Sequence, residues 1–255
     1  MTLPTTILGS GLPVVFLHAF PVDGRMWLDQ ARALSDQFQV IVPDQRGFGK
    51  ARHLADGLDE ISIDQSADDI AQLLTELSID KAVIAGISRG GYVSLAFARR
   101  HPERLLGLML FDTRATPADE KERQNYEAMS SRLATEGMGF VPELMKPRIF
   151  GPTALAQRPD LIRQVEQMIL DQDPQSVAAA ARGMITRLDS RPILPSLTVP
   201  VLAVAGTEDG AYNDTKAIAE AIPNAKFIEI PQAGHFCNLE RPELVTATIR
   251  KFLTR

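Results

Sequence analysis

The sequence contains very little cysteine. Cys237 is the single one among 255 residues. A lone cysteine excludes an internal disulfide and a zinc site built from cysteines, and it gives no indication of an oxidising compartment. We expect Cys237 to be a packing residue, because a redox role requires an exposed and deprotonated thiol.

Runs of like charge and long hydrophobic runs are also missing. The formal net charge is −5 and no stretch of five or six like charges occurs, which argues against a nucleic-acid footprint and a polybasic membrane patch. No lysine or arginine precedes Arg25, and the apolar run before it is too short to cross a bilayer. We expect a cytoplasmic protein that acts on a small molecule, with no nucleic-acid or membrane partner.

Short apolar runs alternate with helical patterns along most of the chain. Continuous runs of this length predict strands buried on both faces of a parallel sheet. The predicted strands are 14–17, 40–42, 82–85, 105–111, 199–205 and 227–230. Apolar residues at spacings of three and four predict helices over 26–35, 64–77, 90–100, 214–221 and 242–253. This alternation is typical of a doubly wound, mostly parallel α/β sheet, and the short N-terminus leaves room for one further edge strand at most.

The alternation stops between Thr116 and Pro195. About four helical segments follow one another there without a strand candidate. We predict a helical cap at 116–195, inserted between two strands of a core that comprises 1–115 and 196–255. Five of the eight methionines fall within this cap, where flexible side chains suit either helix packing or the wall of an apolar pocket.

The stretch VIAGISRGGY contains the pattern G-x-S-x-G as Gly86, Ser88 and Gly90, between a predicted strand and a predicted helix. A serine on a sharp strand-to-helix turn needs very small residues two positions away on either side, because its backbone crowds them. Such a turn lifts the hydroxyl above the sheet edge, where the amide of Arg89 at the helix N-terminus faces developing negative charge. The pattern predicts that Ser88 is a nucleophile, with an ordinary tight turn as the alternative.

A serine hydroxyl needs a base, and the histidines are few. His235 follows the last predicted strand, and Gly234 frees the backbone to carry the ring over the sheet edge. His53 lies in a polar loop, and His101 ends a helix. We predict that His235 is the base.

Two aspartates at strand ends compete to orient this histidine. Asp209 follows a strictly apolar strand, and Gly206 and Gly210 permit a tight loop at the carboxyl edge, where sites gather in such sheets. Asp112 ends another strand at the same edge. We favour Asp209 and expect Asp112 to form hydrogen bonds with nearby loops. Glu208 is expected to point the other way.

With serine, acid and histidine in this order, the chain resembles a capped, single-domain α/β-hydrolase. Further stretches carry the resemblance over nearly the whole chain: HAFPVDGRMW resembles the oxyanion loop of the family, PDQRGFGK its PDxRGxG loop, and AGHFCNLERPE its histidine loop. The resemblance implies that the backbone amides of Phe20 and Arg89 form an oxyanion hole. It also implies that Asp44, Arg46, Gly47 and Gly49 brace the PDxRGxG loop.

Other side chains near the predicted nucleophile are expected to shape a substrate pocket. The resemblance makes His18 a structural or pocket-edge residue, and we expect Tyr92, Met129 and Met145 in the pocket. Arg89 stands where many members of the family have an apolar residue. Its guanidinium is expected either to pair with an acid of the cap or to hold a carboxylate of the substrate.

The resemblance implies two-step acyl transfer by Ser88, His235 and Asp209, without a metal or cofactor. The oxyanion loop and the chain length are most similar to 3-oxoadipate enol-lactonase-like proteins and small carboxylesterases, so a small carboxylic ester or a lactone is the expected substrate. Dehalogenases and epoxide hydrolases have aspartate at the position of Ser88. A C–C bond hydrolase and a cofactor-free perhydrolase stay open on the same triad, and a ligand-binding receptor with vestigial turnover is the alternative of another class.

Overall fold

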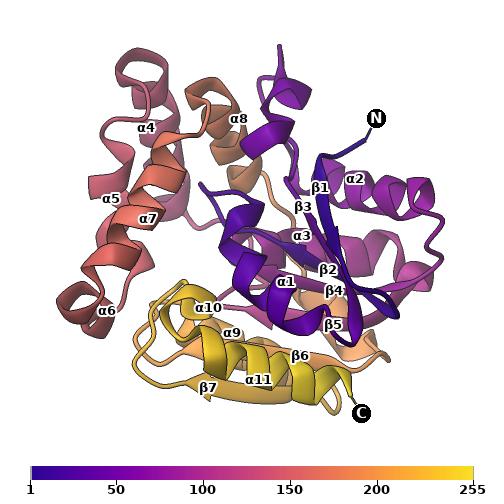
Figure 1. The fold of residues 1–255 in the computed structure, drawn as a ribbon. Coiled ribbons are helices and arrows are strands. Elements are labelled where there is room, and N and C mark those ends of the chain that lie inside the picture. The colour runs from indigo at the N-terminus through magenta and orange to yellow at the C-terminus, as the bar shows by residue number, and fades with distance from the viewer. Residues whose placement is uncertain (1, 255) are drawn as a thin grey trace.

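A seven-stranded sheet of order β1-β3-β2-β4-β5-β6-β7 forms the centre of the computed structural model, which describes residues 2–254 (Figure 1). The strands are β1 (Thr5–Leu8), β2 (Leu12–Leu17), β3 (Phe38–Pro43), β4 (Ala82–Ile87), β5 (Leu105–Phe111), β6 (Val201–Gly206) and β7 (Lys226–Ile230). β1 pairs antiparallel with β3, and the remaining pairings are parallel. The predicted mostly parallel sheet is therefore confirmed, and the N-terminus adds the one edge strand for which it has room.

Helices cover both faces of the sheet, as a doubly wound fold requires. They are α1 (Leu28–Leu34), α2 (Ile63–Glu76), α3 (Arg89–Arg100), α9 (Tyr212–Ala221), α10 (Cys237–Glu240) and α11 (Pro242–Leu253). α1 packs beside α11 on one face, and α2 packs beside α3 on the other (Figure 1).

Local sequence explains how α2 forms and which side it buries. The side chain of Ser62 caps its N-terminus by accepting a hydrogen bond from the backbone amide of Gln65. Ile63, Ile70 and Leu74 are buried at helical spacing, which directs one apolar stripe toward the sheet. Burying each such side chain fully contributes about 1.5–3 kcal/mol.

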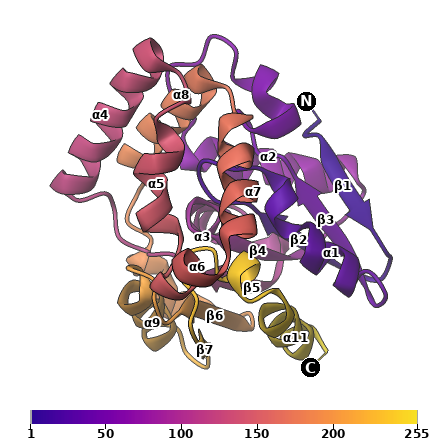
Figure 2. The same cartoon turned by 60° about the vertical axis from the view of Figure 1, so that its left-hand side comes forward.

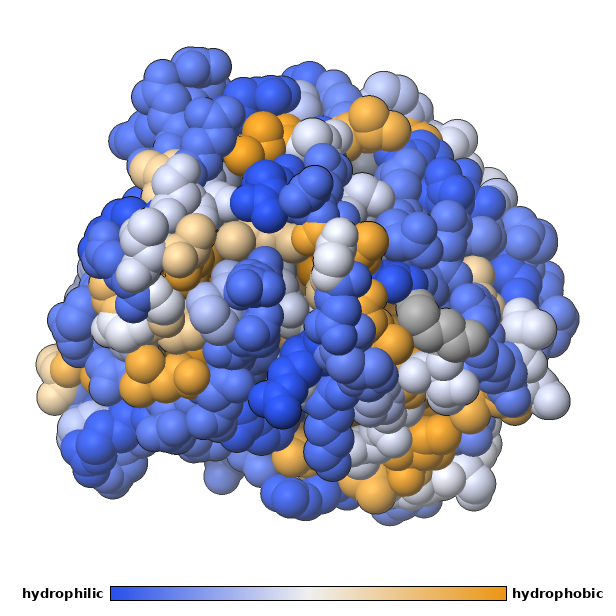
Figure 3. All heavy atoms as spheres, turned by 90° about the horizontal axis from the view of Figure 1, so that it is seen from above, coloured by the Kyte–Doolittle hydropathy of each residue, from blue (hydrophilic) through white to orange (hydrophobic). Residues whose placement is uncertain are grey.

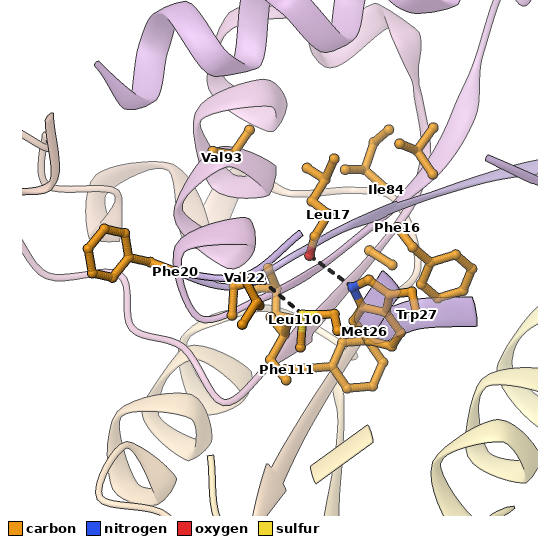
Figure 4. Packing of buried hydrophobic residues seen from close by; sticks show 14 of the residues in the cluster. Phe16, Leu17, Phe20, Val22, Met26, Trp27, Ile84, Val93, Leu110 and Phe111 are labelled. Atoms are coloured by element: carbon orange, nitrogen blue, oxygen red, sulfur yellow. Dashed lines mark hydrogen bonds between the residues drawn. The ribbon is translucent and has the colours of Figure 1, made fainter. Parts of the chain in front are cut away.

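An aromatic cluster beside β2 fixes the chain that follows this strand. Trp27 is fully buried, with its ring centroid 4.9 Å from that of Phe16 and 5.4 Å from that of Phe111 (Figure 4). Its indole N–H donates a hydrogen bond of 3.1 Å to the carbonyl of Leu17. The segment after β2 is thereby held against the core, and it carries Phe20 toward the carboxyl edge of the sheet.

Five helices lie between β5 and β6: α4 (Glu120–Glu136), α5 (Val141–Ile149), α6 (Pro152–Gln157), α7 (Pro159–Leu170) and α8 (Pro174–Ile185). They stand together on one side of the sheet (Figures 1 and 2). The expected helical insertion is therefore present, with one helix more than the roughly four expected, because Pro152 starts the short α6 directly after α5. The boundaries at 116 and 195 stay a prediction.

One face of the molecule is largely polar (Figure 3). On the face seen in Figure 3, hydrophobic residues show in separate patches between hydrophilic ones. Within residues 2–254, none of the helices combines the length and the hydrophobicity that crossing a bilayer requires.

Candidate active site

Ser88 occupies a sharp turn between β4 and α3. Its backbone angles are φ 54° and ψ −118°, in a region that side-chain-bearing residues rarely adopt. A Cβ atom on Gly86 would lie 2.1 Å from the carbonyl oxygen of Gly90, and one on Gly90 would lie 2.3 Å from the carbonyl oxygen of Leu17. The turn therefore needs both glycines of the G-x-S-x-G pattern. Its backbone is anchored by a 3.0 Å hydrogen bond from the amide of Ser88 to the carbonyl of Phe111.

Three side chains from distant parts of the sequence meet above this turn. Nε2 of His235 lies 2.7 Å from Oγ of Ser88, and Nδ1 of His235 lies 3.0 Å from Oδ1 of Asp209. The tautomer protonated at Nδ1 satisfies both contacts, because it donates to the carboxylate and accepts the serine hydroxyl proton. The three groups thus form a continuous line along which a proton can leave Ser88.

The electrostatic interaction between His235 and Asp209 favours protonation of the imidazole. Burial by itself lowers the pKa of His235, but the charge of Asp209 and its hydrogen bond offset burial, and the net pKa lies above the ordinary 6.5. For Asp209, burial by itself raises the pKa, yet the neighbouring His235 brings the net pKa below its ordinary value. An imidazolium formed when Ser88 loses its proton would therefore face an ionised carboxylate.

The two competing acids lie close together, but only Asp209 reaches the histidine. Asp112 is fully buried at the end of β5, and its Oδ1 accepts a 2.7 Å hydrogen bond from the amide of Gly206. Glu208, expected from the sequence to point the other way, lines the same cavity as Ser88 and His235, and its carboxylate accepts hydrogen bonds from the amide and hydroxyl of Thr153 at the start of α6.

Two backbone amides beside Ser88 have no acceptor among the described residues. The N–H of Arg89 is the first of α3, where no intrahelical partner exists. Phe20 lies in the segment after β2, lines the same cavity as Ser88, and its N–H likewise has no acceptor within residues 2–254. Both amides are therefore free to donate to a ligand.

The side chain of Arg89 contradicts both expectations made for it. It is fully buried and donates hydrogen bonds of 2.8 Å to Oε1 of Gln45 and 2.9 Å to Oγ of Ser66. Burial lowers its pKa to about 10, although the charge of Asp69 acts in the opposite direction. The guanidinium contacts neither an acid of the cap nor the cavity, because the first residue of α3 directs its side chain into the core beside α2.

A cavity of about 390 Å³ lies over Ser88, between the sheet edge and the inserted helices. Tyr92 and Met145 line it, whereas His18 and Met129 do not. His18 is fully buried and accepts a 3.0 Å hydrogen bond at Nε2 from the amide of Gln45, so it lies in the core beside the loop and not in the cavity lining. Met129 is buried on α4, which packs against α8, so its expected place in the pocket is also wrong.

Several lining residues were missed by sequence reasoning. Tyr126 packs against Phe20, with ring centroids 6.2 Å apart. Further lining residues are Arg114, Glu122, Asn125, Pro147, Arg148, Phe150 and Met184. Arg114 carried a usable signal, because it follows a strand end at the carboxyl edge closely. For the cap residues no such signal exists, since the tilt of each helix over the sheet decides which side faces the cavity.

The described residues contain no group of three or more histidine, cysteine, aspartate and glutamate side chains arranged to hold a metal ion. Cys237 is fully buried, and burial first of all raises the pKa of its thiol well above the ordinary value. Its position agrees with the packing role expected from the sequence.

Comparisons with known proteins identify the family of the chain. A family model described as alpha/beta hydrolase fold matches residues 13–242. 3-Oxoadipate enol-lactonase 2 of Acinetobacter baylyi is 25% identical over 244 residues, which cover 95% of this chain and 88% of that protein.

Two solved structures extend the likeness to three dimensions. A thermophilic esterase from Thermogutta terrifontis, with malate bound, is 41% identical with a TM-score of 0.94, and the match covers 99% of this chain and 93% of the other. The enol-lactonase from Burkholderia xenovorans LB400 is 28% identical with a TM-score of 0.91, over 99% of this chain and 96% of the other. The chain belongs to the α/β hydrolase fold family and is similar to its enol-lactonases and esterases.

Proposed function

We propose that this protein is a serine hydrolase that cleaves a small carboxylic ester or a lactone by two-step acyl transfer. The observation that carries the proposal is the line from Ser88 through His235 to Asp209, with contacts of 2.7 and 3.0 Å. A serine is a weak nucleophile at neutral pH, and a base within hydrogen-bonding distance removes its proton as it attacks.

In the first step, Oγ of Ser88 attacks the carbonyl carbon while Nε2 of His235 takes its proton. The amides of Phe20 and Arg89 would donate hydrogen bonds to the oxyanion, a contribution that is often the largest in acyl transfer. His235 then returns the proton to the departing alkoxide, and the acyl group stays on Ser88. Throughout, the carboxylate of Asp209 stabilises the imidazolium and fixes its orientation.

In the second step, water takes the place of the alcohol. His235 removes a proton from the water as it attacks the acyl-enzyme, and the tetrahedral intermediate collapses to release the acid and restore Ser88. In a lactone the alcohol and the acid are parts of one molecule, so one ring-opened hydroxy acid, or its keto form from an enol lactone, is the product.

The substrate class rests on the cavity and on the relatives. A volume of about 390 Å³ suits a small molecule, and the lining mixes apolar side chains such as Met145 with the cations Arg114 and Arg148. Proteins named enol-lactonase and esterase are among the similar ones.

The proposal is tested with Ser88→Ala on short-chain nitrophenyl esters, a lactone panel and a fluorophosphonate label. We expect labelling to vanish and kcat to fall by about a thousandfold or more. Ser131→Ala, which changes an exposed serine on α4, serves as the matched control and should behave like the wild type. Undiminished labelling of Ser88→Ala would remove the proposed nucleophile, and a labelled wild-type protein that turns over no ester or lactone would favour a receptor.

A further inference from the structure

The proposed acid of the triad shares its buried site with a second carboxyl group. Asp112 is fully buried and Asp209 exposes 3% of its side chain. Both residues form a hydrogen bond with Gly206. The amide of Gly206 donates to Oδ1 of Asp112 at 2.7 Å, and its carbonyl accepts from the backbone amide of Asp209 at 3.1 Å. The side chain of Asp112 lies within hydrogen-bonding reach of the carboxylate of Asp209.

Each of these carboxyl groups has one oxygen that lacks a partner. Oδ2 of Asp112 and Oδ2 of Asp209 are buried and have no hydrogen-bond partner within residues 2–254, although the thiol of Cys237 lies beside the carboxyl group of Asp112. Two ionised carboxylates are acceptors only, so neither could satisfy the other, and their like charges would repel in a site from which water is excluded. One shared proton removes the repulsion and provides the missing donor.

The surroundings indicate which residue carries that proton. The titratable groups that face Asp112 are Asp209 from the loop after β6, His235 from the segment before α10, and Cys237, the first residue of α10. Asp209 contacts Nδ1 of His235, which favours its ionised form, whereas Asp112 has a backbone amide and a neutral thiol as its other neighbours. Burial, with the charge of Asp209 next, raises the pKa of Asp112 well above its ordinary value.

We propose that Asp112 is a neutral carboxylic acid in the working protein and donates a hydrogen bond to Oδ2 of Asp209. Asp112 is thus a positioning residue: it fixes the carboxylate of Asp209 from the side opposite to His235. The arrangement also limits the charge facing the imidazole to a single negative charge. A second one would raise the pKa of His235 further and leave less of it as the neutral base that the reaction needs.

The protonation state can be read without any turnover. Infrared difference spectroscopy at neutral pH should show the C=O stretch of a protonated carboxyl group that is lost in Asp112→Asn. Glu240→Gln is the control, because Glu240 is another buried carboxyl group whose pKa burial raises. The band assigned to Asp112 should stay in this variant. The same band should persist in Ser88→Ala, so this measurement stands even if the proposed function fails. Absence of a band that depends on Asp112 would overturn the inference.

The positioning role, which rests on the proposed function, is read from the acid limb of kcat/KM against pH. An asparagine at position 112 keeps an acceptor for Gly206 and a donor for Asp209, so we expect the limb to stay within about 0.3 pH units. An ionised Asp112 predicts the opposite, since its replacement by a neutral amide would move the acid limb down by about one pH unit or more.

Asp112→Ala removes the donor to Asp209. We expect kcat to fall about tenfold with little change in KM, and to recover in Asp112→Asn. A downward shift of the limb in Asp112→Asn, or equal losses in the two variants, would overturn the role.

Discussion

Asp209 and Asp112 follow neighbouring strands, but their carboxyl groups face different partners. Oδ1 of Asp209 faces Nδ1 of His235 at 3.0 Å, while Oδ1 of Asp112 is taken by the amide of Gly206. We expect Asp209→Asn to lower kcat by about a hundredfold to ten-thousandfold, because an amide no longer stabilises the imidazolium or holds the right tautomer. Asp112→Asn should cost far less. Steady-state kinetics on one ester checks the order, and the reverse ranking would place the acid on β5.

At the residue scale, the sequence is most informative where the signal is local. The glycines around Ser88 and the histidine after the last strand identified a constellation that the structure brings together. Arg89 shows the limit of such reasoning. It directly follows Ser88, the proposed nucleophile, yet its side chain enters the core, because successive residues at the start of a helix point in different directions.

At the scale of elements, the join between the inserted helices and the histidine loop depends on one carboxylate. Oε2 of Glu240 accepts hydrogen bonds from the amides of Gly151, just before α6, at 3.2 Å and of Gly234 at 2.9 Å. The two glycines approach so closely that a Cβ on Gly234 would lie 2.1 Å from the nitrogen of Gly151. The amide of His235 donates to the carbonyl of Ile149 at 2.8 Å. The position of the proposed base is therefore tied to the end of α5.

This join gives a paired prediction. Glu240→Gln keeps an oxygen for both amides and removes a carboxyl group whose pKa burial raises, so we expect its free energy of unfolding at pH 7 to stay within about 0.5 kcal/mol of wild type. Glu240→Ala leaves two buried amides without an acceptor, and a loss of about 2–4 kcal/mol follows. We expect kcat of the alanine variant to fall as well, because the loop that carries His235 loses its anchor. Urea unfolding and ester kinetics measure both effects, and equal stability of the two variants would contradict the assigned contact.

Element-scale reasoning from the sequence located the strands well and the cavity poorly. The buried strands are continuous apolar runs, a pattern that depends on their own residues alone. Whether Met129 or Met145 faces the cavity depends instead on how α4 and α5 lean over the sheet edge. That orientation is set by contacts between elements far apart in the sequence, such as those of α4 with α8.

At the scale of the whole molecule, the sheet and the inserted helices together place the imidazole of His235 and the carboxylate of Asp209 in a partly enclosed site. As a result, activity and stability are expected to change with pH in opposite directions. Burial lowers the pKa of His235, but the charge of Asp209 and its hydrogen bond together offset burial, so the net pKa lies above 6.5. The proposed reaction needs a neutral imidazole, so kcat/KM should fall as the pH drops through this raised pKa, and its acid limb should lie above pH 6.5.

The same group affects folding in the other direction. A histidine whose pKa is raised on folding adds stability that is fully present below the unfolded value and is lost as the pH rises through the folded value. Asp209, whose pKa is lowered, adds stability that is present above its ordinary 3.8 and is lost only as the pH falls through its folded value. Between these limits, acidification should therefore strengthen the ion pair of His235 and Asp209 while it removes the base.

The measurement compares wild type with His235→Gln, so that the titrations of other groups such as Glu240 cancel. Urea unfolding from pH 8 down to pH 5.5 should give a difference in the free energy of unfolding that shifts in favour of wild type as the pH falls and levels off below about 6.5, the unfolded histidine value. Over the same range, kcat/KM of the wild type should decline. A stability difference that shrinks on acidification, in parallel with activity, would mean that the imidazolium of His235 is not paired with Asp209, and the electrostatic account of the site would fail with it.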